Sequence, residues 1–468
     1  MPRKLSLSNP ILLLLPLGLL TACAVGPDFK KPGMELPNSF SDGGTTWKRQ
    51  TTDALPKPQE WWKLYDDSTL SSLVDRSLAG NQNLVAAAAR LSQAREISKQ
   101  ARSQYFPDID LGVGARRTKS IFRGPAGGSI QYSSFTVPVD LNYEIDAWGK
   151  VRRQVESAKA SEKATEETLH ALRLSVAGEV AQTYWALRAV DADRKSFNRT
   201  LEIRRKALEL LRKRRDAGTI SGLDLSRAEA EVASAEAERI QLDQSRVQLV
   251  NALAVLTGSA ATGFNLPENA TLPTPPAVPG SVPSELLRQR PDIRAALYRV
   301  VAANADIGVA TAAFYPSFSI GASTGYETGS LSNIINPSSL VWSLGANAMV
   351  PLTGQKYLMA QRAAAVAAHS AASADYRQTV LDAVREVENA LQGSSILSQG
   401  QTAQDHALEA SNKTFELSMK RFDAGLVSFL DVVDAERSRL DAERGANAIR
   451  AERLALSVSL IKALGGEW

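Results

Sequence analysis

The chain has 468 residues, with 54 lysines and arginines against 50 aspartates and glutamates, which gives a formal net charge of +4. This near balance argues against a nucleic-acid-binding protein, which would carry a basic patch. A single cysteine excludes a disulfide framework. The three histidines are scattered along helical stretches and do not predict a metal site; they are His170, His369 and His406.

The first 22 residues have the form of a signal peptide. Arg3 and Lys4 precede an apolar core that ends at Leu20 and is too short to span a membrane permanently. The next residues, Thr21-Ala22-Cys23, complete a segment that resembles a bacterial lipobox, so we expect removal of 1–22 and a covalent lipid on Cys23. The alternative is an ordinary signal peptide beside an unrelated cysteine.

Residues 23–69 are expected to form a lipidated N-terminal arm and an equatorial segment. The arm is rich in proline, glycine and threonine, and Trp61-Trp62-Lys63-Leu64-Tyr65 is expected to dock it. From Leu70 to Phe106 apolar residues recur at helical spacing, with an interruption at Gly80-Asn81-Gln82, which predicts a short helix and a longer one.

The hydrophobic period then changes from 3.6 to 2, which predicts a strand hairpin over 108–147. Apolar residues occupy every second position from Phe135 to Ile145, and the polar residues that alternate with them are Thr136, Asp140, Asn142, Glu144 and Asp146. A loop from Arg116 to Gln131 is expected to join this strand to an earlier one. The acidic side chains expected to face a water-filled lumen are Asp140, Glu144 and Asp146.

A second hairpin is predicted over 316–351 by the same alternation. Strands of about ten residues with one apolar and one polar face are typical of outer-membrane barrels. Four strands do not close a barrel, and open edges are not tolerated in lipid. Several copies must therefore pool their strands, and three copies would supply twelve.

Proline is absent from 139–266 and again beyond Pro351. These zones predict two long helices and two returning helices, over 150–217, 223–256, 355–424 and 430–464. A proline-rich linker over 267–290 separates a first structural repeat, 70–266, from a second, 291–468.

The sequence around the two helix-to-helix turns is repeated 207 residues apart. From Leu208 and Phe415, ten of seventeen aligned positions are identical, ending in Asp-Ala-Gly and then Ser-x-x-Asp. The glycine suits a left-handed helix end and Ser-x-x-Asp suits a capping box, so each copy predicts a helix-turn-helix tip.

These features together resemble the TolC-type outer-membrane factors, specifically the NodT-like lipoprotein branch. The most specific motifs are Cys23-Ala24-Val25-Gly26-Pro27-Asp28, Arg290-Pro291-Asp292-Ile293, Ala303-Asn304-Ala305-Asp306-Ile307-Gly308, Tyr315-Pro316 and the two tips. The resemblance implies a mixed α and β membrane fold. In it, three chains form a 12-stranded outer-membrane β-barrel, with four strands per chain, continuous with a 12-helix periplasmic α-barrel.

The resemblance also implies an outer-membrane channel of a tripartite efflux pump in a Gram-negative bacterium. Such a channel carries small toxic compounds passively from an inner-membrane transporter, of the resistance-nodulation-division class, through a periplasmic adaptor. The residues expected to dock the adaptor are Gly218, Thr219, Ile220, Ser221, Gly425, Leu426, Val427 and Ser428. Helix capping alone is the alternative explanation for the repeated serines and aspartates.

One helical turn beyond the second tip, Val433-Asp434-Ala435-Glu436-Arg437 resembles the family segment that forms a periplasmic constriction. The first-half counterpart of Asp434 is Arg227, so we hypothesise a gate made partly by Asp434 with Arg227 or Arg437. Exposed ion pairs contribute about 0 to 1 kcal/mol each, which would make a weak, openable latch. A solvated charged face is the alternative.

Two other classes of protein fit the sequence less well. An enzyme is not expected, because no phosphate loop, nucleophile elbow, metal spacing or histidine-carboxylate cluster is present and no catalytic residue or cofactor is predicted. A non-conducting envelope coiled coil would have no use for four amphipathic strands. A protein-secretion duct of the same fold remains the alternative within the channel class.

Overall fold

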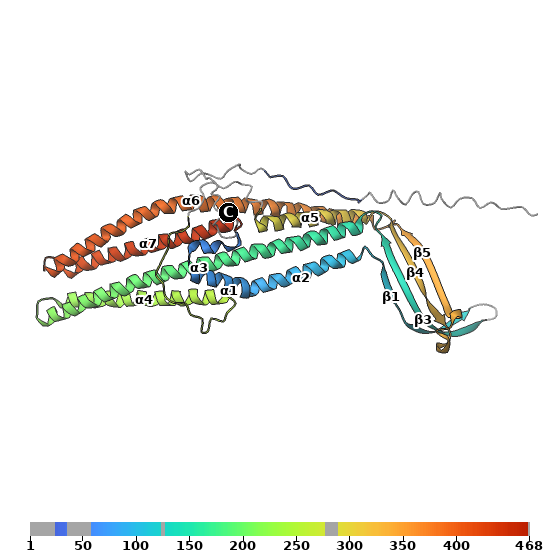
Figure 1. Cartoon of the computed structure of the whole chain (residues 1–468), viewed down its shortest axis with the longest axis horizontal. Coiled ribbons are helices and arrows are strands. Elements are labelled where there is room, and N and C mark those ends of the chain that lie inside the picture. The colour runs from blue at the N-terminus through green and yellow to red at the C-terminus, as the bar shows by residue number, and fades with distance from the viewer. Residues whose placement is uncertain (1–23, 35–57, 123–126, 277–288, 467–468) are drawn as a thin grey trace, which may run out of the picture. The chain divides into compact units, whose positions relative to one another are not determined.

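A computed structural model of the chain describes residues 24–34, 58–122, 127–276 and 289–466 (Figure 1). The expected signal segment and Cys23 lie outside the described residues. The chain passes twice through a helix, antiparallel strands, a very long helix and a returning helix. The helices are η3(Pro58–Tyr65), α1(Ser68–Gly80), α2(Gln82–Ser103), α3(Lys150–Asp216), α4(Gly222–Leu256), α5(Pro291–Ala312), η5(Leu331–Asn333), η6(Pro337–Ser339), α6(Gln355–Asp423) and α7(Phe429–Ala463).

The chain forms two compact units, and each unit takes segments from both halves of the sequence. Unit 1 comprises Met1–Gly33, Arg90–Glu166 and Ala295–Tyr376, and unit 2 comprises Met34–Ala89, Glu167–Arg294 and Arg377–Trp468. The units cut across the two sequence repeats because the long helices α3 and α6 each run through both.

Unit 1 contains one antiparallel sheet. Its strands are β1(Asp108–Leu111), β2(Gly114–Phe122), β3(Gly128–Ile145), β4(Ser317–Thr328) and β5(Leu340–Met349). Both β1 and β2 pair with β3 along the same edge, so they share one strand position interrupted at Gly112 and Val113. The order across the sheet is β1 with β2, then β3, β4 and β5, which gives the four strand positions predicted.

The loop predicted from Arg116 to Gln131 is wrong, because most of it is strand. β2 continues to Phe122 and pairs residue by residue with the start of β3, from Gly114 opposite Thr136 to Phe122 opposite Gly128. This ribbon extends beyond β4, whose last residue, Thr328, faces Phe135. A two-stranded ribbon with water on both sides needs no apolar face, so the alternation that marks the other strands is absent from its sequence.

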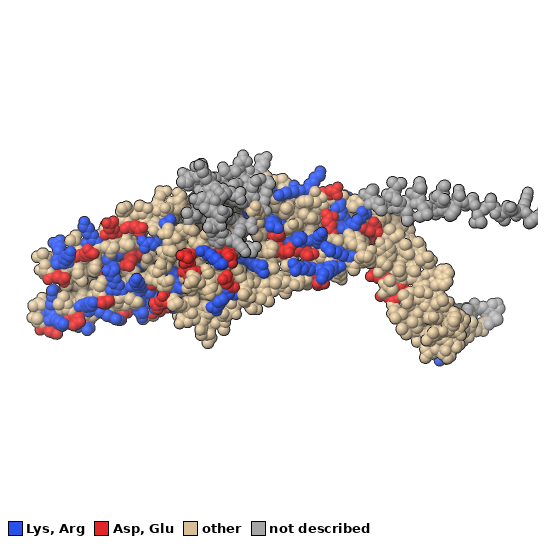
Figure 2. Space-filling view, in the orientation of Figure 1, with Lys and Arg blue, Asp and Glu red and all other residues tan. Residues whose placement is uncertain are grey.

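Directly opposed residues on neighbouring strands lie on the same side of a sheet, so the register sorts the side chains between two faces. We call one the apolar face; it carries Ile109, Leu111, Phe135, Val137, Val139, Leu141, Tyr143, Ile145, Phe318, Ile320, Ala322, Thr324, Tyr326, Leu340, Trp342, Leu344, Ala346 and Ala348. The other, the polar face, carries Asp108, Asp110, Asp140, Asn142, Glu144, Ser319, Ser323, Glu327, Ser343 and Asn347. On the side shown in Figure 2, few charged side chains lie over the strands.

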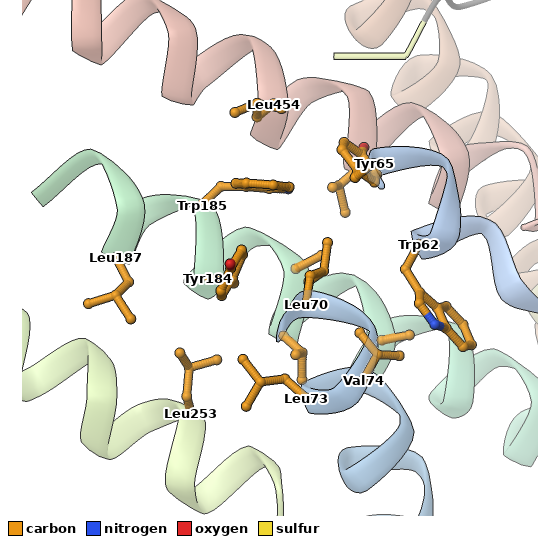
Figure 3. Close-up of a cluster of buried hydrophobic side chains, with 14 of the residues drawn as sticks. Trp62, Tyr65, Leu70, Leu73, Val74, Tyr184, Trp185, Leu187, Leu253 and Leu454 are labelled. Atoms are coloured by element: carbon orange, nitrogen blue, oxygen red, sulfur yellow. The ribbon is translucent and has the colours of Figure 1, made fainter. Parts of the chain in front are cut away.

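The core of unit 2 forms where η3 and α1 pack against α3, α4 and α7. Its largest fully buried side chains include Trp185, Tyr184, Leu70 and Leu253 (Figure 3). Tyr184 donates a hydrogen bond of 2.6 Å to Asp67, which also caps α1, and burial followed by this bond raises the pKa of Tyr184 to about 12. Trp61 and Trp62 belong to this core, whereas most of the arm that they were predicted to dock, 35–57, lies outside the described residues.

Buried charges hold the start of the inter-repeat linker against unit 2. Arg188 and Asp191 on α3 form an ion pair of 2.8 Å in which both side chains are about 1% exposed. Arg188 donates to the carbonyl of Pro267, and Arg246, paired with Asp191, donates to the carbonyl of Leu266. These bonds satisfy backbone carbonyls of a segment that has no regular structure of its own.

Candidate functional site

Each long helix ends in a turn built on a glycine in the left-handed region of backbone conformation. Gly218 follows α3 with a φ of 69°, and Gly425 follows α6 with a φ of 74°. Each glycine amide and the amide after it bond back to carbonyls of the last helical turn, as in a Schellman motif. The helix-turn-helix tips predicted from the repeat are therefore present in both halves.

The serines that follow these glycines start the returning helices. Ser221 with Asp224 and Ser428 with Asp431 each form a complete capping box, which confirms the capping role that the sequence offered for them. The hydrogen bond from the Ser428 hydroxyl, followed by the bond from its backbone amide, lowers the pKa of Asp431. Capping accounts for these four residues whether or not they also meet a partner.

Six of the eight residues predicted to dock an adaptor are exposed in the single chain. They are Gly218, Thr219, Ser221, Gly425, Leu426 and Ser428. Leu426 is 70% exposed, which is unusual for a leucine held in a tight turn. Two further exposed leucines flank the tips and were missed by the sequence analysis, Leu223 at 58% and Leu430 at 39%.

The other two predicted docking residues, Ile220 and Val427, are half-buried and point into the molecule. They pack against an apolar cluster that joins the ends of the two helical hairpins, and Phe422 and Phe429 lie in this cluster with ring centroids 6.0 Å apart. Figure 1 shows the two tips side by side in unit 2. Ile220 and Val427 therefore hold the tips together, and the surface open to a partner lies on the residues beside them.

The predicted gate residues lie just behind this cluster. Asp434 is exposed, and its only ion-pair partner among the described residues is Arg437 on the same helix, at 4.0 Å. Arg437 also contacts Glu231 on α4. Arg227 is exposed and has no ion pair within the described part of the chain, so the predicted pair of Asp434 with Arg227 does not form inside one chain.

A buried charge network beside the gate residues was missed by the sequence analysis. Glu436, 2% exposed, accepts hydrogen bonds from Thr200 at 2.6 Å and from Arg204 at 2.7 and 3.1 Å. Arg204 also donates to Glu231, at 3.0 Å, and Arg439 lies 3.5 Å from Glu436. The network joins α3 and α4 of the first hairpin to α7 of the second.

The sequence contained a signal for this network. Phe429, Val432, Val433 and Glu436 recur at the spacing of one helix face, and the first three are buried apolar residues. A carboxylate in line with such a stripe is buried with it and must find a cationic partner. The basic residue at the matching depth on the other hairpin is Arg204.

The acidic residues predicted to line a lumen occupy two different environments. Asp140 and Glu144 lie on the polar face of the sheet, and Glu144 forms an ion pair of 3.0 Å with Lys150. Asp146 does not lie on that face. It follows the end of β3 and accepts hydrogen bonds from the amides of residues 151 and 152, at 2.9 and 3.0 Å, so it caps α3.

The register of β1 on β3 places two further carboxylates on the polar face, and the sequence analysis did not predict either of them. Asp108 faces Asn142, and Asp110 faces Asp140 directly across β1 and β3. Like charges in opposed positions destabilise a sheet, so this pair needs a compensating reason to be present.

The junction between sheet and helices in unit 1 brings together several of the sequence motifs. Ala24 contacts Gly149, the amide of Val25 donates to the carbonyl of Trp148 at 3.0 Å, and Gly26 packs on the backbone of Gly308. A Cβ on Gly26 would lie 2.5 Å from the Cα of Gly308, and Gly26 has a φ of 100°, so this position requires glycine. The segment that follows Cys23 is thereby fixed at the place where β3 becomes α3.

The remaining motif, Arg290-Pro291-Asp292-Ile293, is a structural clamp in unit 2. The guanidinium of Arg290 bonds to Asp292 at 2.7 Å, to Glu386 on α6 at 2.9 Å and to the carbonyl of Ala463 at 2.9 Å. One buried side chain thus joins the start of α5, the middle of α6 and the end of α7.

Among the described residues, no group of three or more histidine, cysteine, aspartate or glutamate side chains is placed to hold a metal ion. Within the same residues, no helix is both long enough and apolar enough to cross a membrane.

A family model described as "Outer membrane efflux protein" matches the chain twice, over residues 73–259 and 282–466, once in each half of the repeat. The chain is 31% identical to the solvent efflux pump outer membrane protein SrpC of Pseudomonas putida, over 98% of both chains. It is 26% identical to the cation efflux system protein CusC of Escherichia coli, over 96% of both.

Two solved structures share this fold along most of the chain. The outer-membrane channel OprN matches with a TM-score of 0.86 and 31% identity, over 95% of this chain and 100% of that one. The CmeC outer membrane channel of Campylobacter jejuni matches with a TM-score of 0.87 and 25% identity, over 95% of each chain. The predicted mixed α and β fold is confirmed by these matches.

Proposed function

This chain belongs to the outer membrane efflux protein family, the TolC-type factors, and from that premise we propose that three copies assemble into one passive duct. The chain is an outer-membrane channel of an efflux pump in a Gram-negative bacterium. In the proposed assembly, three sheets close into a 12-stranded barrel that continues as a barrel of 12 helices in the periplasm.

The incomplete sheet is the observation that carries this proposal. Among the described strands, β1 and β2 pair only with β3, and β5 pairs only with β4, so both edges of the sheet are open. Open edges are not tolerated in lipid, and four strand positions are too few to close a barrel. Pairing β5 of one copy with β1 and β2 of the next satisfies every edge.

The start of α6 supports the same assembly. The side chains of residues 355–366 are almost all exposed in the single chain, and Tyr357 and Met359 are 71% and 61% exposed. A helix that leaves such residues in water on all sides lacks a neighbour. Helices of adjacent copies supply neighbours on both flanks.

The duct exports small toxic compounds delivered by an inner-membrane transporter of the resistance-nodulation-division class through a periplasmic adaptor. Relatives named for solvent and cation efflux support this class of cargo. The exposed parts of the tips, Thr219 and Leu426 with their flanking leucines, dock the adaptor. Asp434 and Arg437 form a weak latch that the adaptor opens.

A lipid on Cys23 anchors the chain at the membrane surface. Ala24, the next residue, contacts Gly149 at the junction of β3 and α3, where a strand leaving the bilayer becomes a periplasmic helix. The acyl chains would therefore enter the leaflet beside the base of the barrel. Mass spectrometry of the N-terminal peptide tests the lipid, and Cys23→Ser should abolish it.

Native mass spectrometry and conductance of the purified protein test the duct. We expect a trimer mass and discrete cation-permeable channels in planar bilayers. In a strain that lacks the gene, the restored chain should raise resistance to detergents and dyes only when adaptor and transporter are present. A stable monomer, or a trimer without conductance, would refute the duct.

A further inference from the structure

Charged side chains are unevenly divided between the two faces of the sheet. Every described carboxylate of the strands lies on the polar face, namely Asp108, Asp110, Asp140, Glu144 and Glu327. The lysine and arginine side chains of the strands all belong to β2. Arg117 faces Ser133 and Lys119 faces Gln131, so both lie on the same side as Phe135, the side of the apolar face.

These two cations lie just beyond one end of the apolar face. Apolar residues occupy that face of β3 from Ile145 to Phe135, eleven positions, which matches the length a tilted strand needs to cross the hydrocarbon core. Pairing of β3 with β4 ends at Phe135, and Arg117 is in the next outward-facing position along the ribbon. Arg117 and Lys119 therefore fall at the level of the lipid headgroups.

The direction of the chain fixes which leaflet this is. α3 begins at Lys150, five residues after β3 ends at Ile145, so the Ile145 end of the apolar face adjoins the helices. In the proposed duct the helices are periplasmic, which places the Phe135 end, with Arg117 and Lys119, in the outer leaflet.

Neither cation has a side-chain partner in the part of the chain that the structure describes. Arg117 and Lys119 are exposed, and although their backbones belong to the pairing of β2 with β3, their side chains form no hydrogen bond or ion pair with any described residue. Two adjacent unpaired cations on a lipid-facing surface, with no carboxylate on that face, are complementary to anionic headgroups. Arginine adds two parallel N–H donors, which suit phosphate oxygens.

We propose that Arg117 and Lys119 form a binding site for the phosphate groups of a phosphorylated lipid in the outer leaflet. The proposal rests on the duct described above, because that assembly makes this face the lipid face. The bound lipid would cover the base of the β2–β3 ribbon and fix the height of the barrel in the membrane.

Lipid titration of the intact trimer by native mass spectrometry tests this site, with bisphosphorylated lipid A as the probe. For the double variant Arg117→Gln with Lys119→Gln, we expect the apparent Kd to rise by about threefold to tenfold per charge removed. Arg116→Gln is the matched control: it removes the same charge from the adjacent residue of β2, on the polar face. Its Kd should equal that of the original chain, and Arg117→Lys should bind nearly as well.

Two comparisons decide the outcome. Lipid A stripped of its phosphates should bind the original chain as weakly as lipid A binds the double variant, and millimolar inorganic phosphate should not displace the lipid. Equal weakening by Arg116→Gln, no effect of removing the phosphates, or displacement by free phosphate would each overturn the proposal. The same spectra report the trimer mass, so failure of the lipid site is distinguishable from failure of the duct.

Discussion

Arg204 on α3 donates two hydrogen bonds to one carboxylate oxygen of Glu436 on α7, from Nη2 at 2.7 Å and from Nε at 3.1 Å. The contact joins the first helical hairpin to the second behind the tips. Removing one partner of a buried ion pair leaves the other charge in a medium that does not solvate it. The pair therefore resists separation of α3 and α7 far more than the exposed pair of Asp434 and Arg437 resists opening of the tips.

Glu436→Gln should weaken the joint between the hairpins. We expect a loss of about 3 kcal/mol in the free energy of local opening. This value is at the lower end of the range for a broken buried ion pair, because Arg204 still pairs with Glu231 in the variant. Hydrogen exchange of the amides in 196–208 and 432–443 measures it.

Two control variants complete this measurement. Asp434→Asn, at a side chain 75% exposed, should change the same amides by only about 0 to 1 kcal/mol. Arg204→Met combined with Glu436→Leu should recover most of the loss, since apolar residues replace a buried pair well. A double variant as weak as Glu436→Gln would contradict the electrostatic explanation.

The start of α7 should fray in acid because of Asp431. Hydrogen bonds from Ser428 lower the pKa of this carboxyl in the folded state, so its capping contribution is fully present above the ordinary aspartate pKa of about 3.9 and is lost as the pH falls through the lowered value. Amides of 429–432, corrected for intrinsic exchange rates, should lose protection progressively as the pH falls from about 3.9 through the lowered value. Asp431→Asn should abolish the pH dependence, and its persistence there would assign it to another group.

The repeated tip sequence shows how much local chemistry predicts. Gly218 and Gly425 adopt the positive φ that a Schellman turn requires, and the Ser-x-x-Asp segments form the capping boxes expected. These features are decided within a few residues of chain. The strands of the apolar face were predictable for a similar reason, since lipid on one side and water on the other impose alternation.

The failed predictions involve partners that sequence spacing does not reveal. Asp146 continues the polar alternation of β3, but it is also the carboxylate nearest to the free amides at the start of α3. It therefore accepts hydrogen bonds from those amides and caps the helix. β2 has no apolar period, because neither side of the ribbon is buried. Glu436 continues the buried stripe of Phe429, Val432 and Val433, but its partner Arg204 is 232 residues away in sequence, and only the approach of the two hairpins pairs them.

Neutralising one member of the opposed carboxylates Asp110 and Asp140 should change both selectivity and stability. Asp110→Asn removes a like-charge contact across β1 and β3, which should stabilise the sheet by about 0.2–1 kcal/mol. It also removes negative charge from the polar face, so the ratio of cation to anion permeability in planar bilayers should fall. Glu144→Gln should have the smaller effect on permeability, because Lys150 already balances that charge. The reverse order would mean that the Asp110 position does not face the conducting path.

Photo-crosslinking from the tips should distinguish docking residues from packing residues. A probe replacing Leu426, 70% exposed, should capture a periplasmic adaptor in cells, whereas a probe replacing Val427, the next residue, should react mainly within the chain, because Val427 packs on the cluster of Phe422 and Phe429. Probes at Thr219 and Ile220 provide the same contrast in the first repeat. Trimer assembly of each variant is checked in the same cells. Capture from Val427 but not Leu426 would mean that the adaptor separates the tips as it binds, while no capture from either, with trimers intact, would show that the tips are caps and the adaptor grips another surface.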